Sequence, residues 1–282
     1  MQKKKRIFRI IIILVIITAL VPYYFLEDKS EYLRMYFIDV GQGDGILIKT
    51  PEGKVIVIDG GAYNDFVKKV GQKLSFRKRN IDLLIITHAH ADHYLGLINV
   101  IEQYKINTIF YSGYDVNLED YNYLMNLIKE KNINLIKVKF GQVISFEKNI
   151  NLEILHPFSI KEKEEDINNT SVVIRLSYKN FDAIFTGDMT CEGEKELVEK
   201  NQNLESKLLK IGHHGSRWAS CDYFLEKVKP QISIIQVGIN NSFNHPHQET
   251  LQRLEKINTQ ILRNDKLGDI IIYSDGEKYW KK

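Results

Sequence analysis

Cysteine is scarce in this sequence of 282 residues, which contains only Cys191 and Cys221. Two cysteines cannot supply the disulfide framework that holds small secreted domains together, although an extracellular location would permit one bridge. Cys191 follows a loop that we interpret below as part of a metal site, so a metal-ligand role is one hypothesis. The simpler interpretation, which we favour, is a small residue near a loop.

A large excess of positive charge is also lacking. The formal net charge is +3, and residues 1–30 contain six Lys or Arg and two Asp or Glu. The remainder of the chain is therefore close to neutral, which argues against a broad electrostatic funnel for nucleic acid and leaves room for a local basic patch. The sequence also has no internal repeat at a period of roughly 20–50 residues, which excludes repeat architectures.

The N-terminal segment differs from the rest of the chain. An uncharged run, Ile10 to Leu26, follows five cations, Lys3, Lys4, Lys5, Arg6 and Arg9. As a helix this run spans about 25 Å, slightly less than a hydrocarbon core of about 30 Å, and Ile7 and Phe8 extend it. Tyr23 and Tyr24 lie where an interfacial aromatic belt is expected. We predict one transmembrane helix.

The positive flank predicts a cytoplasmic N-terminus, with the rest of the chain outside the cell membrane. A cleaved signal peptide has the same charge order and would give a secreted protein. No clear cleavage site follows the run, so we favour a single-pass anchor. The predicted organisation is an anchor with its linker over residues 1–31 and a catalytic domain over residues 32–282.

Four metal-ligating side chains lie together after the apolar run Leu83 to Ile86. They are His88, His90, Asp92 and His93, in the order His-x-His-x-Asp-His. Alternate residues of an extended segment share a face, so the first three can point the same way, and His93 follows where a helix is predicted to begin. Imidazole and carboxylate ligands suit Zn²⁺, with Mn²⁺ or Fe as alternatives.

Polar residues end several other predicted strands. Asp59, Asp188 and the pair His213/His214 each follow an apolar run. In a layered α/β protein, side chains at strand ends converge on one edge. The pattern therefore predicts a single site built from segments that are distant in the sequence.

These motifs resemble the metallo-β-lactamase fold superfamily. Residues Thr87 to His93 are similar to its signature motif, and Phe185 to Asp188 are similar to the loop that carries its bridging aspartate. Four more segments resemble the hydrolase domain of ComEC-type DNA-uptake proteins: Asp39–Asp44, Ile58–Gly61, Leu209–Ser216 and Asn244–His247. The pneumococcal phosphorylcholine esterase domain is similar too. ComEC-type proteins have many membrane spans, so we do not expect this chain itself to form a DNA channel.

The resemblance implies an α/β fold, a four-layer αβ/βα sandwich preceded here by the N-terminal transmembrane helix. It also implies one or two Zn²⁺ ions. His88 and His90 would form the first metal site, and Asp92, His93 and His214 the second, with Asp188 bridging the two metals. A metal-bound water has its pKa lowered towards neutrality, so hydroxide becomes available as the nucleophile. Asp92 is thus also expected to take part in catalysis.

One feature departs from the superfamily pattern. Many members place a further His between the two motifs, whereas residues 167–171 here contain none, as in the ComEC-like group. Asn169 is a candidate replacement, as a carbonyl ligand or a substrate contact. His156 is the one intervening histidine, and we interpret it as a packed or capping side chain. The first metal site is therefore the weaker one, and a mononuclear enzyme remains an alternative.

Several residues beside the histidines are candidates for substrate contact. His213 would contact substrate if His214 ligates the metal, and His245 would contact a phosphate or protonate a leaving oxygen. Lys210 and Ser216 would hold a phosphate group. For Asp39, Gln42 and Asp44 we favour hydrogen bonds that fix a loop, and for Asp59 the orientation of a metal ligand.

The favoured function is a membrane-anchored, extracytoplasmic, metal-dependent phosphodiesterase. Its substrate would be DNA or a phosphocholine or teichoic-acid decoration of the cell wall. Alternatives are hydrolysis of another ester, a lactone, a thioester or a β-lactam in the same fold, and a non-catalytic module of competence or wall assembly. No protein partner is predicted.

Overall fold

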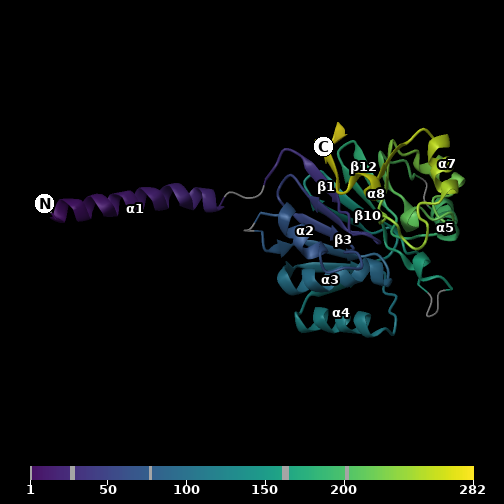
Figure 1. Cartoon of the computed structure of the whole chain (residues 1–282), viewed down its shortest axis with the longest axis horizontal. Helices are drawn as coiled ribbons and strands as arrows, with labels where there is room; N and C mark the ends of the chain where they lie inside the picture. The colour runs from purple at the N-terminus through teal and green to yellow at the C-terminus, as the bar shows by residue number, and fades with distance from the viewer. Residues whose placement is uncertain (1, 26–28, 76–77, 161–164, 201–202) are drawn as a thin grey trace.

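The computed structural model describes residues 2–25, 29–75, 78–160, 165–200 and 203–282. Helix α1 (Gln2–Phe25) extends away from the body of the molecule (Figure 1). Its apolar side chains from Ile7 to Ile16 are exposed. Among the described residues, no helix is both long and apolar enough to span a membrane. The predicted transmembrane helix is therefore not confirmed, and Leu26 and the side chains of Tyr23 and Tyr24 lie outside the described residues.

Two large sheets form the centre of the body. In spatial order, the first consists of β17 (Tyr279–Lys281), β16 (Ile270–Ser274), β1 (Leu33–Phe37), β2 (Ile46–Lys49), β3 (Val55–Ile58), β5 (Leu83–Ile86), β7 (Thr108–Tyr111) and β8 (Asn134–Lys137). The second consists of β15 (Gln260–Arg263), β14 (Ile232–Ile235), β13 (Leu208–Lys210), β12 (Phe181–Phe185), β11 (Val173–Tyr178), β10 (Ile150–His156) and β9 (Val143–Glu147). A small parallel pair, β4 (Asn80–Ile81) and β6 (Lys105–Ile106), lies apart from them.

Each sheet contains a run of parallel strands. They are β3, β5, β7 and β8 in the first sheet and β12, β13, β14 and β15 in the second. Strands such as β3 and β5 are continuously apolar and fully buried, because both faces of a parallel sheet are covered. The parallel runs matter for function, because neighbouring strands end at the same edge.

Three apolar clusters define four layers. Inward side chains of the two sheets, including Phe37 and Phe185 with ring centroids 6.1 Å apart, form the central cluster. The second cluster packs the first sheet against α2 (Phe66–Lys73), α3 (Ala91–Gln103) and α4 (Glu119–Glu130). The third packs the second sheet against α5 (Cys191–Lys200), α6 (Asp222–Val228) and α7 (Gln248–Lys256). The predicted αβ/βα sandwich is confirmed (Figure 1).

Short helical turns complete the chain. They are η1 (Ile167–Thr170), η2 (Gly212–Gly215) and α8 (Asn264–Leu267). Inside η2, His213 and His214 have φ values of 46° and 53°, in the left-handed region that non-glycine residues rarely adopt. Residues in such rarely populated backbone conformations are often found in functional loops.

Candidate metal centre

The strand ends β3, β5, β12 and β13 converge at one edge of the sandwich. Asp59, directly after β3, is completely buried and has a φ of 53°. Its carboxylate accepts hydrogen bonds from the Thr87 backbone N–H at 2.9 Å and the Thr87 hydroxyl at 2.6 Å. It also accepts one from His93 Nδ1 at 2.8 Å. Asp59 therefore ties the end of β3 to the end of β5 and fixes the ring of His93.

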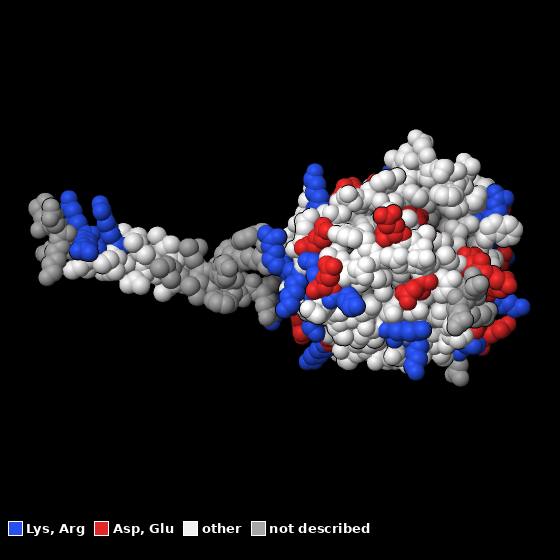
Figure 2. Space-filling view, turned by 90° about the horizontal axis from the view of Figure 1, so that it is seen from below, with Lys and Arg blue, Asp and Glu red and all other residues white. Residues whose placement is uncertain are grey.

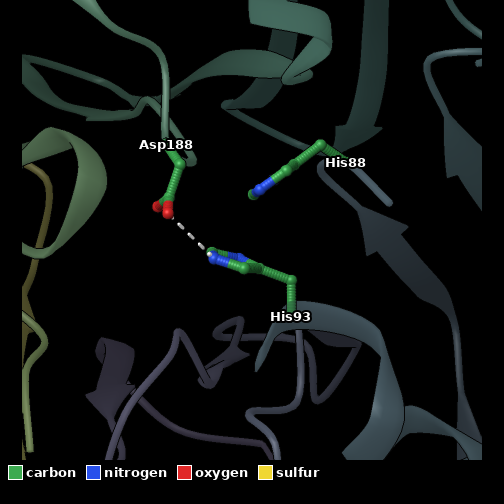
Figure 3. Close-up of side chains that lie close together, drawn as sticks. All are labelled: His88, His93 and Asp188. Atoms are coloured by element: carbon green, nitrogen blue, oxygen red, sulfur yellow. Dashed lines mark ion pairs between the residues drawn. The ribbon is translucent and has the colours of Figure 1, made fainter. Parts of the chain in front are cut away.

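His93 consequently presents its other nitrogen to the loop after β12. Its Nε2 lies 3.2 Å from Asp188 Oδ2, and the His88 ring centroid lies 4.2 Å from that of His93 (Figure 3). One ligand atom from each of His88, His93 and Asp188 falls within 4.8 Å of the others. The three side chains come from β5, α3 and the β12 loop and point toward one another, as a metal site requires.

His214 completes a second group on the other side of Asp188. Its Nε2 lies 3.1 Å from Asp188 Oδ2 and 3.3 Å from Asp92 Oδ2. Its Nδ1 lies 3.0 Å from the backbone oxygen of Gln236, which orients the ring. Asp92, His93 and His214 form a second triad within 4.8 Å. Asp188 thus stands between the two groups, in the place predicted for a bridging ligand.

The spacing of these atoms fits a shared divalent cation. Two ligands at metal distances of about 2.0–2.2 Å in a tetrahedron are separated by roughly 3.3–3.5 Å. The imidazole–carboxylate separations around Asp188 are 3.1 and 3.2 Å. Among the described residues, the buried Nε2 atoms of His93 and His214 and Oδ1 of Asp188 make no hydrogen bond. Their contacts are ion pairs, of His93 and His214 with Asp188 and of Asp188 with Lys210, and a cation held between them would coordinate all three atoms.

His90 lies at the margin of this arrangement. Its Nδ1 is 3.0 Å from Nε2 of His88, so the two rings direct one nitrogen each toward the same point. His90 is half-buried and, unlike His88, does not belong to a triad within 4.8 Å among the described residues. The first metal site therefore has one well-placed imidazole, His88, and one peripheral imidazole, His90.

Electrostatics favour positive charge at the centre. Burial opposes protonation of His93 and His214, but nearby carboxylates, Asp188 foremost, outweigh it and raise both pKa values well above their usual range. Burial raises the pKa of Asp188, but His214, His93 and Lys210 outweigh it and hold that pKa well below its ordinary value. Burial and His93 lower the pKa of His88. Carboxylates that stabilise an imidazolium would equally stabilise a divalent metal.

Lys210 and Asp44 form a buried ion pair beside the triads. The Lys210 ammonium is in contact with the Asp44 carboxylate, donates to the Gly187 carbonyl at 2.9 Å and lies 3.5 Å from Asp188 Oδ1. Lys210 is completely buried, so the predicted phosphate contact is wrong: its ammonium is a counter-ion inside the protein. Asp44 also lies 3.5 Å from His214 Nδ1, a role that its loop position in the sequence did not reveal.

His213 and His245 lie at the opening of the site. His213 Nε2 is 4.0 Å from Asp188 Oδ2, and its ring centroid is 5.5 Å from that of His245. Both rings are partly exposed. Burial and the neighbouring His214 and His213 lower the pKa of His245 to about 4. The structure therefore places these two imidazoles beside the candidate ligand cluster, on a partly exposed side of it.

The other two predicted substrate contacts differ in burial: Asn169 is half-buried and lines a pocket with His156 and Glu192, whereas Ser216 is buried. Asn169 Oδ1 accepts hydrogen bonds from Thr190 N at 3.1 Å and Thr190 Oγ1 at 2.8 Å, which anchors the loop after Asp188. Ser216 is buried, and its Oγ accepts from Trp218 N at 3.3 Å. Both side chains support loops that carry candidate metal ligands, and burial excludes only Ser216 from the predicted contact with substrate. Ser171, not singled out from the sequence, accepts from Asp188 N at 3.1 Å.

Cys191 and Cys221 are joined in a disulfide, with Cα atoms 5.6 Å apart. Cys191 is therefore more than a small residue near a loop: it forms the one bridge that two cysteines allow, and its sulfur is not available as a metal ligand. The bridge connects α5, which follows the Asp188 loop, to the start of α6, which follows the His214 loop. It holds together the two loops that supply Asp188 and His214.

Comparison with known proteins agrees with this geometry. A family profile described as the metallo-beta-lactamase superfamily matches residues 38–238, which include His88, Asp92, His93, Asp188 and His214. The chain belongs to the metallo-β-lactamase superfamily. Proteins with the metallo-β-lactamase fold bind divalent metals, and the buried histidine–aspartate cluster is the corresponding feature here.

Similar proteins include competence proteins, which confirms the resemblance to ComEC-type proteins. The chain is 28% identical over 250 residues to "ComE operon protein 3" of Bacillus subtilis, covering 83% of this chain and 32% of that protein. It is 28% identical over 232 residues to "Competence protein ComA" of Neisseria gonorrhoeae, covering 82% of this chain and 30% of that protein. The chain thus spans about a third of the length of these metallo-β-lactamase relatives.

Among solved structures, the chain is similar to CmlA, a diiron β-hydroxylase from Streptomyces venezuelae. The TM-score is 0.55 at 14% identity, covering 91% of this chain and 55% of that chain. At this identity the likeness shows the metallo-β-lactamase fold alone.

Proposed function

We propose that this chain is a metal-dependent phosphodiesterase that acts on DNA or on a phosphodiester of the cell wall. The observation that carries the proposal is Asp188, which lies 3.2 Å from His93 and 3.1 Å from His214 between two ligand triads. A pair of sites around one carboxylate suits a reaction in which charge develops on both the attacking and the leaving oxygen. The similarity to competence proteins supports a DNA-related substrate.

Each protein group has a separate task in this proposal. His88, His93, Asp92, Asp188 and His214 would hold the metals, with His90 at the margin, and Zn²⁺, Mn²⁺ and Fe all suit this ligand set. Bound metals would lower the pKa of a water and polarise the phosphoryl oxygen. Asp59 and the Gln236 carbonyl hold the rings of His93 and His214 in place. Such outer contacts set ligand orientation and basicity.

The two histidines at the opening would act on the substrate directly. His245 is held by its backbone N–H, which donates to Asn241 Oδ1 at 2.9 Å, and by its carbonyl, which accepts from Asn241 Nδ2 at 2.6 Å. This bracing would let the neutral imidazole donate an N–H hydrogen bond to the leaving oxygen. His213, 4.0 Å from Asp188 Oδ2, would donate to a non-bridging phosphate oxygen.

The test is turnover of the full chain with bis-p-nitrophenyl phosphate, DNA and a phosphocholine ester. We expect hydrolysis by the wild type, with His88→Ala and Asp188→Ala lowering the rate at least a hundredfold. Asp120→Ala, in the first turn of α4 and away from the cluster, is the matched control and should retain full activity. Equal rates in wild type and Asp188→Ala would refute the proposal. Turnover of a lactone or β-lactam only would favour the alternative hydrolase activities.

We also propose that α1 anchors the protein to the cell membrane, with the catalytic domain on the outer side. Helix α1 has 24 residues, about 36 Å at about 1.5 Å per residue, and exposes apolar side chains from Ile7 to Ile16. Lys5, Arg6 and Arg9 lie near its start, where Figure 2 shows blue side chains on the projecting helix. The expected result is sedimentation with membranes that resists alkaline carbonate. Release by carbonate would contradict the anchor.

A further inference from the structure

Exposed apolar side chains lie on the loops next to the candidate metal ligands. In the body of the protein, the loops that supply or adjoin the metal ligands carry Tyr63, Trp218, Ile239 and Phe243, with exposed fractions of 61%, 70%, 68% and 58%. Large apolar groups this exposed are unfavourable in water, and clusters of them commonly mark binding sites. Ile239 and Phe243 belong to the loop that carries His245, and Trp218 lies four residues after His214.

Phe243 is connected to the metal centre by a series of aromatic rings. Its ring is stacked on that of His245, with centroids 5.7 Å apart and an interplanar angle of 25°. The His245 centroid lies in turn 6.3 Å from that of His214, which belongs to a ligand triad. The series runs from an exposed ring through a half-buried ring to a buried one. His245 covers one face of the Phe243 ring, so a planar group would stack on the other face, from which its phosphate would reach back toward His245.

Tyr63 and Ile239 form a second group of exposed side chains, next to the start of the 238–247 loop. The Tyr63 ring covers Gly41, whose added Cβ would lie 3.5 Å from it. Gly41 is in turn packed against Gly238, and Tyr63 and Ile239 line one shallow pocket. Trp218 lies on the His214 loop, where its carbonyl accepts from Cys191 N at 2.7 Å. The exposed side chains thus belong to three loops, each of which follows or carries a candidate site residue.

Charge at this opening is low. Of the cations nearest to these rings, Lys69 lies 3.6 Å from Asp65, and Arg217 lies 3.0 Å from Glu249. Duplex DNA is held mainly by unpaired cations that contact its phosphates, and its bases are stacked inside. Single strands are bound in positively charged grooves by aromatic side chains on which their unstacked bases lie. The exposed rings here match the stacking part of the second mode.

We propose that the opening binds single-stranded DNA, with a nucleobase stacked on Phe243 and a further base on Trp218 or Tyr63. This inference rests on the proposed phosphodiesterase function and names the form of its substrate. The stacked base would position the adjoining phosphodiester beside His245 and His213. Phe243 is then a residue that determines specificity for a strand with accessible bases.

The experiment is fluorescence anisotropy of the full chain in EDTA, so that binding is measured without turnover. The probes are a labelled single-stranded oligodeoxythymidylate, an abasic deoxyribose-phosphate oligomer of the same length, and a blunt duplex. We expect wild type to bind the single strand at least tenfold tighter than the abasic oligomer, because stacking adds to phosphate contact. Phe243→Leu should weaken single-strand binding about fivefold to tenfold, and Phe243→Trp should restore it.

Tyr123→Leu is the matched control, because Tyr123 is 51% exposed on α4, and it should bind like wild type. Equal affinity of wild type for the abasic and base-bearing strands, or equal behaviour of Phe243→Leu and Tyr123→Leu, would overturn the inference. Absence of single-strand binding would do the same. These failures differ from failure of the proposed function, which would appear as an absence of metal-dependent phosphodiester turnover in wild type.

Discussion

At the scale of residues, two buried carboxylates and one half-buried carboxylate lie close together. Asp44, Asp92 and Asp188 contact His214 and repel one another, so cations are needed among them. Lys210 supplies one such charge permanently, because Asp44 and Asp188 raise the pKa of its ammonium against the opposing effect of burial. Removing this charge should therefore affect stability as well as metal binding.

Lys210→Met is expected to lower the free energy of unfolding by about 3–5 kcal/mol, because it leaves buried carboxylates without their partner. Urea denaturation monitored by circular dichroism measures this. Lys195→Met, on the exposed face of α5, should change stability by less than about 0.5 kcal/mol. Equal stability of the two variants would show that the ion pair contributes nothing.

Glu194 gives a prediction about pH. Burial raises its pKa to about 8 from an ordinary value of 4.5, although its carboxylate accepts from Ser220 N at 2.6 Å and Cys221 N at 2.9 Å. The folded state then holds a proton that the unfolded state releases between pH 4.5 and about 8. Stability from this group is fully present below pH 4.5 and declines as pH rises to about 8, by a few kcal/mol.

The measurement is the unfolding free energy from pH 5 to 9 for wild type and Glu194→Gln. Glutamine does not titrate, so the difference between the two curves should fall with rising pH and become constant above pH 8. Parallel curves would mean that Glu194 is ionised throughout and that its two N–H contacts outweigh burial.

At the scale of elements, the Cys191–Cys221 bridge joins the loops that present Asp188 and His214. Replacing both cysteines by serine should lower the unfolding free energy by about 3 kcal/mol, because a closed loop with a sequence separation of 30 residues is released. Metal affinity should also fall, since the two loops lose their mutual constraint. Reductant should reproduce both effects in wild type and neither in the serine variant. Wild type that is indifferent to reductant would contradict this account.

Helix α3 must approach β3 closely to place Asp92 and His93. A Cβ added at Gly96 would lie 2.0 Å from the Gly60 carbonyl oxygen, so Gly96→Ala should push α3 outward. We expect a loss of about 1–3 kcal/mol in stability and weaker metal binding. Gly71→Ala, at an exposed position of α2, is the control and should stabilise slightly. Thermal melting compares the two, and equal melting temperatures would refute a close α3 contact.

The fold and the meeting of several site residues could be predicted from the sequence, because strand ends determine which residues lie close together. Apolar runs before Asp59, His88 and Asp188 indicated buried strands, and parallel strands end at one edge, so these side chains could be placed together. The ion pair of Lys210 could not be predicted. Its strand is buried on both faces, so the alternation of side chains along the strand does not reveal which face meets a carboxylate. The disulfide depended on two loops whose separation only the folded chain defines.

At the scale of the whole molecule, the strand ends that carry the metal ligands close one edge of a four-layer sandwich, and α1 extends from the body. The proposed anchoring would hold the enzyme at a membrane, while the sandwich supplies a rigid frame for ligands that come from both sheets. Rigid positioning matters because metal ligands displaced by an ångström lose affinity and activity. The central claim is that this frame holds metals which hydrolyse phosphodiesters.

The most direct test is a metal titration of the full chain after removal of metal with a chelator. Bound metal would be counted by mass spectrometry while bis-p-nitrophenyl phosphate turnover is followed at each addition of Zn²⁺ or Mn²⁺. We predict no turnover without metal, and activity that rises in step with bound metal until the site is full, with Asp188→Asn binding less and remaining inactive. Full turnover by the metal-free protein, or metal bound equally well by Asp188→Asn, would contradict the account.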